Sequence, residues 1–383
     1  MKFLLIYVPN LRFPIFHFDW NENYFGNICT IRSGIGFKAD EYVEQGVPLL
    51  KIDNVGYGNI KWNNISYLPE TYLKQYPFLK LNENDIVLAL NRPITNNQLK
   101  ISKLTSKDIP SILYQRVGKI NVSSDYNLDY IYYLLTKNVF DFVLKTSIGS
   151  DQPFISTENL KKLIMKVPTI TEQQKIGHFL SLIDQRIQTQ IKIIDDYNSL
   201  KMGIYNWMFK ENYADYKLKQ LAYIVKGDQI NNDQLLSNGS YYMMNGGTSP
   251  SGYLDSYNVS ENTISISEGG NSCGYVQFNS SPFWSGGHCY TIQNVNSALI
   301  ENKYLYHYLK HKEKEIMNLR IGTGLPNIQK KDLENFTIFV PSLLIQRKNL
   351  ALFEMLDEKI CILNEELERL EMQKKYLLRN MFI

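Results

Sequence analysis

Two stretches of the chain carry apolar residues at the spacing of a coiled coil. In the first stretch, which begins near Thr171, eight of the ten positions that a heptad repeat places on one face are apolar or aromatic. The second stretch, shifted by 173 residues, again has eight of ten such positions. Each helix is expected to run roughly 60 Å. The predicted seam contains Ile176, Leu180, Ile183, Ile187 and Ile194 in the first helix and Phe353, Leu356, Ile360, Leu363 and Leu367 in the second.

The two helices belong to a longer internal repeat that aligns without gaps. Its identities include Gln173 with Gln346, Asp184 with Asp357, Lys201 with Lys374 and, upstream, Pro153 with Pro326 and Leu160 with Leu333. A repeat of this length exceeds the short periods of solenoid proteins. It predicts two modules, each a globular block followed by a helix. Such a chain can fold with pseudo-two-fold symmetry, for which duplex DNA is a natural ligand.

Each predicted helix has one apolar stripe to bury, and the chain contains two such helices. Pairing them with each other within the chain satisfies both stripes. If the pair is antiparallel, the two globular blocks are expected at opposite ends of it. The alternative is that each helix packs independently on its own block.

The blocks themselves mix helical and strand patterns, which predicts an α+β fold. Short runs of β-branched or apolar residues bounded by Gly, Pro or Asn read as strands, and apolar residues at helical spacing read as helices. A proline after Val167 closes the first block. The strands are expected at 47–52, 85–90 and 115–120, the helices at 128–145 and 303–316, and a loop at 147–156 followed by a short amphipathic stretch from Thr157.

The ends of the two blocks resemble each other more than their middles do. The second block opens with KLKQLAYIV at 217–225 and Gly227, which parallels 24–31 and Gly34 in the first block. Its middle is rich in Gly, Ser and Asn, as in YYMMNGGTSPSGY at 241–253. Similar ends with different middles are expected if the two middles bind different ligands.

Composition sets broad limits on the class of protein. A chain of 383 residues with 44% hydrophobic content suits two ordered domains. The net charge of +3 is mildly basic and fits either a DNA-binding protein with clustered cations or simple solubility. The four cysteines form no CxxC pair, no stretch is long and apolar enough to span a membrane, and no signal-peptide pattern opens the chain. A cytoplasmic protein without membrane association is expected.

The sequence lacks the familiar motifs for methyl transfer, nucleotide binding and zinc binding. A DNA methyltransferase that flips its target base needs Asp, Asn or Ser followed by two prolines and then Tyr or Phe. The nearest string, SPFW at 281–284, lacks the second proline and is interpreted as a turn. No P-loop is present, and Gly34-Ile35-Gly36 marks only a loop. His307 and His311 lack the HExxH glutamate and are interpreted as part of a solvated, lysine-rich face rather than a zinc site. We therefore expect no catalytic residue and no metal ligand on this chain.

Contact with DNA requires cations for the phosphates and polar side chains for the base edges. Loops that follow predicted strands or contain glycines hold the candidates. Arg92 is the strongest single candidate, although an ordinary surface arginine is an equal alternative, and the glycines that bring backbone close to a ligand also simply form turns. The predicted DNA-binding residues are Ser33, Lys38, Asn91, Arg92, Gln98, Lys100, Lys226, Asn245, Thr248, Ser249 and Asn271.

The order of several short motifs resembles one known family, the specificity subunits of type I restriction-modification systems. The resemblance extends over essentially the whole chain, with departures at Ile345-Gln346-Arg347, where Glu-Gln is usual, and at Asn84, where glycine is common. The motifs are VPNLRFPIFHFDW at 8–20, YFGNICTIRSGIG at 24–36, DIV at 85–87, NRP at 91–93, EQQKIGHFLSLIDQRI at 172–187, NGG at 245–247, GY at 252–253 and LPNIQ at 325–329.

The resemblance implies a non-catalytic subunit with two target recognition domains, each reading one half of a bipartite DNA sequence. It implies an antiparallel helical spacer that fixes the distance between half-sites and docks two methyltransferase subunits, which restriction subunits can join. It places S-adenosylmethionine on the methyltransferase, and ATP and Mg²⁺ on the motor-nuclease partner. The corresponding ranges are 1–168 for the first recognition domain, 169–211 for the central helix, 212–340 for the second recognition domain and 341–383 for the C-terminal helix.

Two alternatives from other classes remain open. The chain could be a fragment of a self-contained restriction-methylation enzyme, which predicts that the isolated protein binds S-adenosylmethionine. It could also be a coiled-coil scaffold without DNA binding, which predicts no sequence-selective shift of random duplexes.

Overall fold

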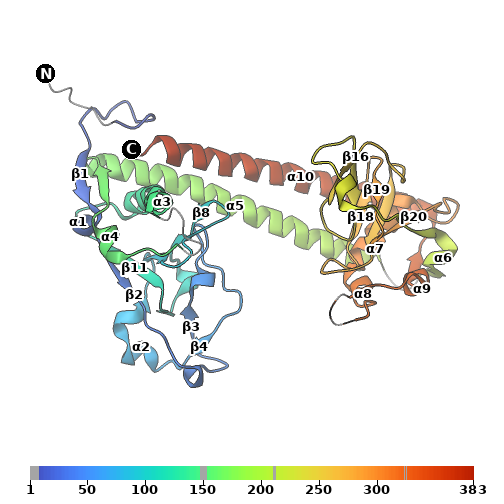
Figure 1. Ribbon diagram of the computed structural model, residues 1–383, viewed down its shortest axis with the longest axis horizontal. Coiled ribbons are helices and arrows are strands. Elements are labelled where there is room, and N and C mark those ends of the chain that lie inside the picture. The colour runs from blue at the N-terminus through green and yellow to red at the C-terminus, as the bar shows by residue number, and fades with distance from the viewer. Residues whose placement is uncertain (1–7, 147–152, 210–212, 323, 325) are drawn as a thin grey trace. The chain divides into compact units, whose positions relative to one another are not determined.

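The computed structural model describes residues 8–146, 153–209, 213–322, 324 and 326–383 (Figure 1). Its contacts divide the chain into two units. Unit 1 holds the described residues up to Thr189 together with Leu367–Ile383, and unit 2 is Gln190–Glu366. Each unit therefore contains one globular domain and part of each long helix.

The domain of unit 1 is built on two four-stranded sheets. In the first sheet every neighbouring pair is antiparallel, and in the second β10 runs parallel to β3. The first sheet has the order β2 (Cys29–Ser33), β11 (Val117–Val122), β6 (Ile86–Ala89), β9 (Ile101–Lys103), and the second β4 (Tyr67–Leu68), β3 (Val47–Leu50), β10 (Ser111–Leu113), β5 (Lys80–Leu81). The remaining elements are the pairs β1 (Asn21–Tyr24) with β12 (Ile164–Val167) and β7 (Ile94–Thr95) with β8 (Gln98–Leu99), and the helices α1 (Phe25–Ile28), α2 (Tyr72–Gln75), α3 (Leu128–Thr146) and α4 (Thr157–Lys161).

The domain of unit 2 repeats this plan with one strand fewer in its second sheet. Here β19 runs parallel to β15, as β10 does to β3. The first sheet has the order β14 (Tyr223–Lys226), β20 (Cys289–Gln293), β17 (Thr263–Ser267), β18 (Val276–Asn279), and the second β16 (Gly252–Leu254), β15 (Tyr241–Met244), β19 (Trp284–Ser285). The remaining elements are the pair β13 (Ala214–Lys217) with β21 (Thr337–Val340) and the helices α6 (Leu218–Leu221), α7 (Asn302–His311), α8 (Glu313–Met317) and α9 (Lys330–Glu334).

The two domains share their topology although their middle sequences differ. The sheet order β2-β11-β6-β9 in unit 1 corresponds to β14-β20-β17-β18 in unit 2, strand for strand. The predicted likeness of the two blocks at their ends therefore extends through their cores. Fold is preserved because alternating apolar residues decide strand placement, whereas exposed loop residues are free to vary.

The long helices α5 (Ile170–Met208) and α10 (Leu343–Asn380) pair antiparallel in each unit. In unit 1, Lys374 forms an ion pair with Asp184 at 2.6 Å, and Leu377 of α10 and Met381 just after it belong to the cluster that contains Ile176. In unit 2, Lys201 pairs with Asp357. The repeat thus exchanges the partners, so that each lysine meets the aspartate of the other helix. Of the predicted seam, Ile176, Leu180, Ile187, Ile194, Phe353, Leu356 and Leu363 are buried, and Ile183, Ile360 and Leu367 are half-buried.

The architecture confirms the expected α+β fold with two domains and an antiparallel two-helix coiled coil. The strands predicted at 47–52, 85–90 and 115–120 are β3, β6 and β11, and the helix at 128–145 is α3. Of the predicted loop at 147–156, residues 147–152 lie outside the described ranges. Within the described part of the chain, no helix combines the length and hydropathy needed to cross a bilayer.

The helix predicted at 303–316 is wrong in one respect, because the structure breaks it at Lys312. That residue leaves helical geometry at φ −87 and ψ 10, which separates α7 from α8. Immediately after the break, the carboxylate of Glu313 accepts a hydrogen bond of 2.8 Å from the backbone N–H of Val276 on β18. Val276 is 37 residues from Glu313 in the sequence, so the periodicity of the helix could not predict the contact or the break beside it.

Candidate nucleic-acid interface

In unit 1 the predicted residues gather at one edge of the first sheet. Because β11 is antiparallel to both β2 and β6, the register places Ser33 opposite Gly118 and Ala89 opposite Val117. The loops that follow β2 and β6 therefore leave the sheet at the same edge. Ser33 ends β2 and Lys38 lies in the segment that follows it, whereas Asn91 and Arg92 lie in the loop after β6.

The turn before β11 links these two loops and consists of Gln115 and Arg116, which the prediction had wrongly included in a strand at 115–120. The backbone N–H of Gln115 donates to the carbonyl of Ile35 at 3.0 Å, and the carbonyl of Arg116 accepts from Leu90 at 2.9 Å. Arg116 has a φ of 64 and an exposed side chain. It is thus a second arginine between the predicted loops. An arginine with positive φ has no signature in the sequence, so pattern reasoning could not have selected it.

Arg92 lies two residues before a polar hairpin formed by β7 and β8. Its backbone N–H donates to the carbonyl of Pro153 at 2.9 Å, its φ is 46, and its side chain is exposed. The hairpin turns at Asn96 and Asn97, with φ values of 50 and 56. Two consecutive residues with positive φ suit the tight turn of a two-residue hairpin, and asparagine tolerates that conformation. Gln98 follows the turn and is exposed.

The base of the hairpin holds Lys100 inward and brings in residues that were not predicted. The ammonium of Lys100 donates to the carbonyl of Ile52 at 2.7 Å, and burial lowers the pKa of this lysine. Beside it, the hydroxyl groups of Tyr57 and Thr95 are 2.7 Å apart, and the Lys61 ammonium lies 5.6 Å from the centre of the Tyr57 ring. Lys61 is exposed and is the better placed of the two lysines for a phosphate. The sequence did contain a signal for this site, because 57–62 places Lys61 between the aromatic residues Tyr57 and Trp62.

Unit 2 presents the equivalent edge, where β14 and β17 end and β20 begins. The register pairs Lys226 with Tyr290 and Ser267 with Cys289. Glu268 follows β17, and its carboxylate is 2.5 Å from the Lys226 ammonium and 3.5 Å from Nδ1 of His288. Glu268 is 10% exposed, whereas Lys226 and His288 are 51% and 62% exposed. A buried carboxylate therefore holds two exposed basic side chains at this edge.

Hydrogen bonds connect this cluster to the Gly-rich loop that holds the other predicted residues. Asn245 accepts from the backbone N–H of His288 at 2.9 Å, and the Ser267 hydroxyl donates to Gly246 at 2.7 Å. Gly246 has a φ of 82, which residues other than glycine rarely adopt, and an added Cβ would lie 3.2 Å from His288. Lys226 and Asn245 are thus brought together by Glu268 and His288, both missed because they lie 42 and 43 residues away in sequence.

The remaining predicted residues of unit 2 are exposed on neighbouring loops. Thr248 and Ser249 lie between β15 and β16, in the loop that Asn245 begins. Asn271 follows Gly270, whose φ is 76 and whose N–H donates to Pro326 at 3.1 Å. Backbone hydrogen bonds anchor these loops, and the side chains of Thr248, Ser249 and Asn271 are exposed on them.

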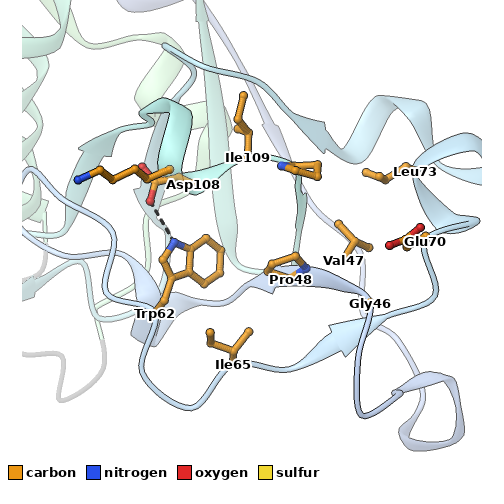
Figure 2. Close-up of a pocket in the computed structure, with 11 residues that line it drawn as sticks. Gly46, Val47, Pro48, Trp62, Ile65, Glu70, Leu73, Asp108 and Ile109 are labelled. Carbon is orange, nitrogen blue, oxygen red and sulfur yellow. Dashed lines mark hydrogen bonds between the residues drawn. The ribbon is translucent and has the colours of Figure 1, made fainter.

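Unit 1 also contains a cleft of about 520 Å³, which is lined by residues other than those of the candidate interface (Figure 2). Most of its lining residues are apolar, and the Trp62 indole N–H donates to Asp108 at 3.0 Å, as the dashed line in Figure 2 marks. None of the predicted DNA-binding residues lines it. The lining residues are Gly46, Val47, Pro48, Trp62, Ile65, Glu70, Leu73, Lys107, Asp108, Ile109 and Pro110.

The interpretation of the two histidines as part of a solvated face is wrong. His307 is 4% exposed, and its Nδ1 lies 2.8 Å from the Tyr205 hydroxyl; burial lowers its pKa from 6.5 to about 4. His311 is half-buried against the rings of Tyr205 and Phe209. Residues three and four apart share a face of a helix, and this face packs on α5. No cluster of possible metal ligands occurs among the residues that the structure describes.

The interpretation of 281–284 as a turn holds only for its first residue. Ser281 lies in a bend, but Phe283 is buried and bridges Val259, and Trp284 begins β19. The aromatic pair enters a sheet because Phe283 fills the small apolar cluster that contains Met244. The segment is therefore structural.

Sequence comparison finds one family on both halves of the repeat. The profile of the type I restriction modification DNA specificity domain matches residues 19–195 and 210–372. The type I restriction enzyme MjaVIII specificity subunit of Methanocaldococcus jannaschii is 42% identical over 190 residues, covering 49% of this chain and 45% of that protein. The EcoAI specificity subunit of Escherichia coli is 29% identical over 175 residues, covering 45% and 29%. This chain thus spans less than half the length of either relative in these matches.

Solved structures share the fold over nearly the whole chain. A type I restriction-modification S subunit from M. genitalium superposes with a TM-score of 0.63 at 19% identity, covering 98% of this chain and 99% of that one. A chain from a structure of the type I R-M system, on its complex assembly and conformational transition, gives a TM-score of 0.56 at 15% identity, covering 94% and 96%. Since the family profile matches both modules and most of the sequence, this chain belongs to the type I restriction-modification DNA specificity family.

Proposed function

We propose that the chain reads a bipartite duplex target, one half-site per recognition domain, as the specificity subunit of a type I restriction-modification complex. The recognition domains are residues 1–168 and 212–340. The helical segments 169–211 and 341–383 set the distance between the half-sites and dock two methyltransferase subunits, which restriction subunits can join. The complex acts in the cytoplasm.

One observation supports this proposal above the others. Both domains gather exposed basic and amide side chains at the same edge of the same sheet, although the loops that supply them have little sequence in common. A shared scaffold with different polar loops is what two readers of different half-sites require. Cations at this edge neutralise phosphate, while amide and guanidinium groups can read bases in the major groove.

The chain itself is proposed to be non-catalytic, with chemistry supplied by its partners. S-adenosylmethionine is assigned to the methyltransferase subunits, and ATP and Mg²⁺ to the restriction subunits. Equilibrium dialysis of the isolated chain against S-adenosylmethionine tests this division. Tight binding by the chain alone would favour the reading as a self-contained enzyme fragment.

The modular proposal is tested by selecting bound sequences from a pool of random duplexes and footprinting the selected target. Arg92→Ala is expected to weaken protection of one half-site, at a cost of about 1–3 kcal/mol if the side chain reads a base. Lys162→Ala is the control, because Lys162 follows α4, which packs on α1 at the opposite end of β2. Equal loss at both half-sites contradicts modular reading, and a pool without any selected motif favours a scaffold that does not bind DNA.

A further inference from the structure

A buried glutamine joins each domain to its long helix by the same hydrogen bonds. Gln173 lies in the first turn of α5 and is 3% exposed. Its Oε1 accepts from the backbone N–H of Asn127 at 3.0 Å, and its Nε2 donates to the carbonyl of Pro168 at 2.9 Å. Asn127 immediately precedes α3, and Pro168 immediately follows β12. One amide therefore fixes the helix to both the last strand and the main helix of domain 1.

Gln346 occupies the equivalent position in unit 2 and is 0% exposed. Its Oε1 accepts from the backbone N–H of Glu301 at 2.8 Å, just before α7. Its Nε2 donates to Pro341, just after β21, and to Leu299, both at 2.8 Å. We call each of these buried glutamines, with its hydrogen bonds, a brace. In both units the brace joins the long helix to the last strand and to the main helix of the domain, although the residues around it differ.

Gln190 shows that a buried glutamine on these helices does not need to contact a domain. It lies on α5 and is 7% exposed, and its Nε2 donates to the carbonyl of Leu363 on α10 at 2.8 Å. Gln190 therefore ties helix to helix, whereas Gln173 and Gln346 tie helix to domain. The three residues form a matched set in which chemistry and burial are similar and only the partner changes.

The hydrogen bonds of each buried glutamine stiffen the joint between its domain and its helix. Each brace satisfies backbone groups at the end of a strand and the start of a helix, where no regular secondary structure can satisfy them. Removing the amide leaves a buried backbone donor and acceptor without partners, which weakens the joint. A loosened joint allows the domain to change its angle on the helix while the sheet edge that faces a ligand stays intact.

We infer that Gln173 and Gln346 are positioning residues that fix the angle of each domain on its helix and thereby restrict the chain to one spacing between DNA half-sites. This inference rests on the proposed function, because a spacing exists only if two half-sites are read. It assigns to the joints a role in spacing that is separate from the reading of bases, which belongs to the loops at the sheet edge.

The test uses the full chain assembled with methyltransferase subunits and a pool of duplexes with random sequence. Bound duplexes are sequenced, and both the half-site motifs and the distribution of spacings between them are recorded. The variants are Gln173→Met, Gln346→Met and their combination, with Gln190→Met as control. Methionine keeps the unbranched shape and removes the hydrogen bonds. If a methionine variant does not fold, the shorter amides of Gln173→Asn and Gln346→Asn replace it.

The combined variant is expected to keep both half-site motifs and to select a broader range of spacings. Preference for the wild-type spacing over spacings one base pair longer or shorter should fall about tenfold, which corresponds to about 1.4 kcal/mol. Gln190→Met should keep the wild-type distribution. The inference is overturned if the combined variant retains that distribution, if Gln190→Met broadens it equally, or if the half-site motifs are lost together with the spacing. A wild-type chain that selects no bipartite motif overturns the proposed function itself.

Discussion

Unit 1 and unit 2 share a glutamine brace and a lysine–aspartate pair, but the side chains around these contacts differ. In unit 1 Asp184 also accepts from the Tyr133 hydroxyl at 2.8 Å. In unit 2 the corresponding neighbour of Asp357 is His307, at 4.0 Å. What the repeat retained is therefore the geometry of the joint, while the residues that complete each joint were free to change.

The N-terminal segment accounts for one difference between the two units. In unit 1, Arg12 makes two hydrogen bonds of 2.7 and 2.8 Å to Glu172, a carboxylate that is only 1% exposed. The equivalent residue in unit 2 is Ile345. Only five residues separate α5 from β13, which is too short for a segment like 8–20 to precede the second domain. Ile345 is 37% exposed, so the position that departs from the usual Glu-Gln motif lacks the burial that Glu172 has beside Arg12 in unit 1.

Breaking the Arg12–Glu172 pair is expected to have the largest effect, and in unit 1 alone. Arg12→Ala leaves a buried carboxylate without its partner, and removing one member of a buried ion pair costs about 3–5 kcal/mol. The measurement is urea unfolding followed by hydrogen exchange in peptides of each unit. The double variant Arg12→Leu with Glu172→Ile, which imports the unit 2 residue, should recover most of the loss. Equal destabilisation of both units contradicts this account.

Acidification is expected to weaken unit 2 more than unit 1. Burial holds the pKa of His307 at about 4 in the folded chain, against an ordinary value of 6.5, so the unfolded chain gains a proton first as the pH falls. The stability from neutral His307 is complete above pH 6.5 and is lost towards pH 4, by about 3 kcal/mol in total. Burial also lowers the pKa of His311, which acts in the same direction.

The contribution of His307 is isolated by comparing the wild type with His307→Asn, which keeps a polar side chain and does not titrate. The difference in unfolding free energy of unit 2 should depend on pH only between about 6.5 and 4. Tyr133, at the matching place in unit 1, stays neutral because burial raises its pKa. A flat difference across this range would show that His307 is not held neutral by burial.

Two glycines of α5 are expected to respond in opposite directions to the same change. A Cβ on Gly177 would lie 2.5 Å from Asn127 Oδ1 and 2.8 Å from the Tyr130 nitrogen, so Gly177→Ala should destabilise unit 1 by about 1–3 kcal/mol. A Cβ on Gly203 meets nothing within 4 Å, so Gly203→Ala should stabilise unit 2 by about 0.5–1 kcal/mol. Thermal unfolding of both variants measures the signs. Two changes of the same sign contradict the close approach of α3 to α5.

The smallest effect is expected from the exchanged ion pairs. Lys374→Met and Lys201→Met keep the apolar stem and remove a partly exposed charge, which should cost about 1 kcal/mol or less. Unit 1 should lose less than unit 2, because the Tyr133 hydroxyl still donates to Asp184. Denaturant midpoints for each unit, at low and high salt, check both the order and the screening. A larger loss in unit 1 would show that the hydrogen bond from the Tyr133 hydroxyl to Asp184 does not compensate for the missing lysine.

The long helices, their seam and the existence of two modules were determined by the sequence itself. Helical packing repeats every few residues, so Ile176, Leu180 and Phe353 reveal their burial through spacing alone. The matching ends of the two blocks likewise predicted a common plan, and the sheet order agrees with it. Local periodicity carries this information because a helix or strand fixes which of its own residues face one side.

The composition of each sheet edge was decided only by tertiary structure. Lys226 was selected for its charge, but its pairing with Glu268 and the position of His288 depend on the register of β14, β17 and β20. Arg116 reaches the edge of unit 1 through a turn whose neighbours are distant in sequence. Contacts between residues tens of positions apart leave no periodic signal, because the chain between them can vary in length and sequence without altering the pairing. The helices were therefore readable from the sequence, and the surfaces proposed to meet DNA required the fold.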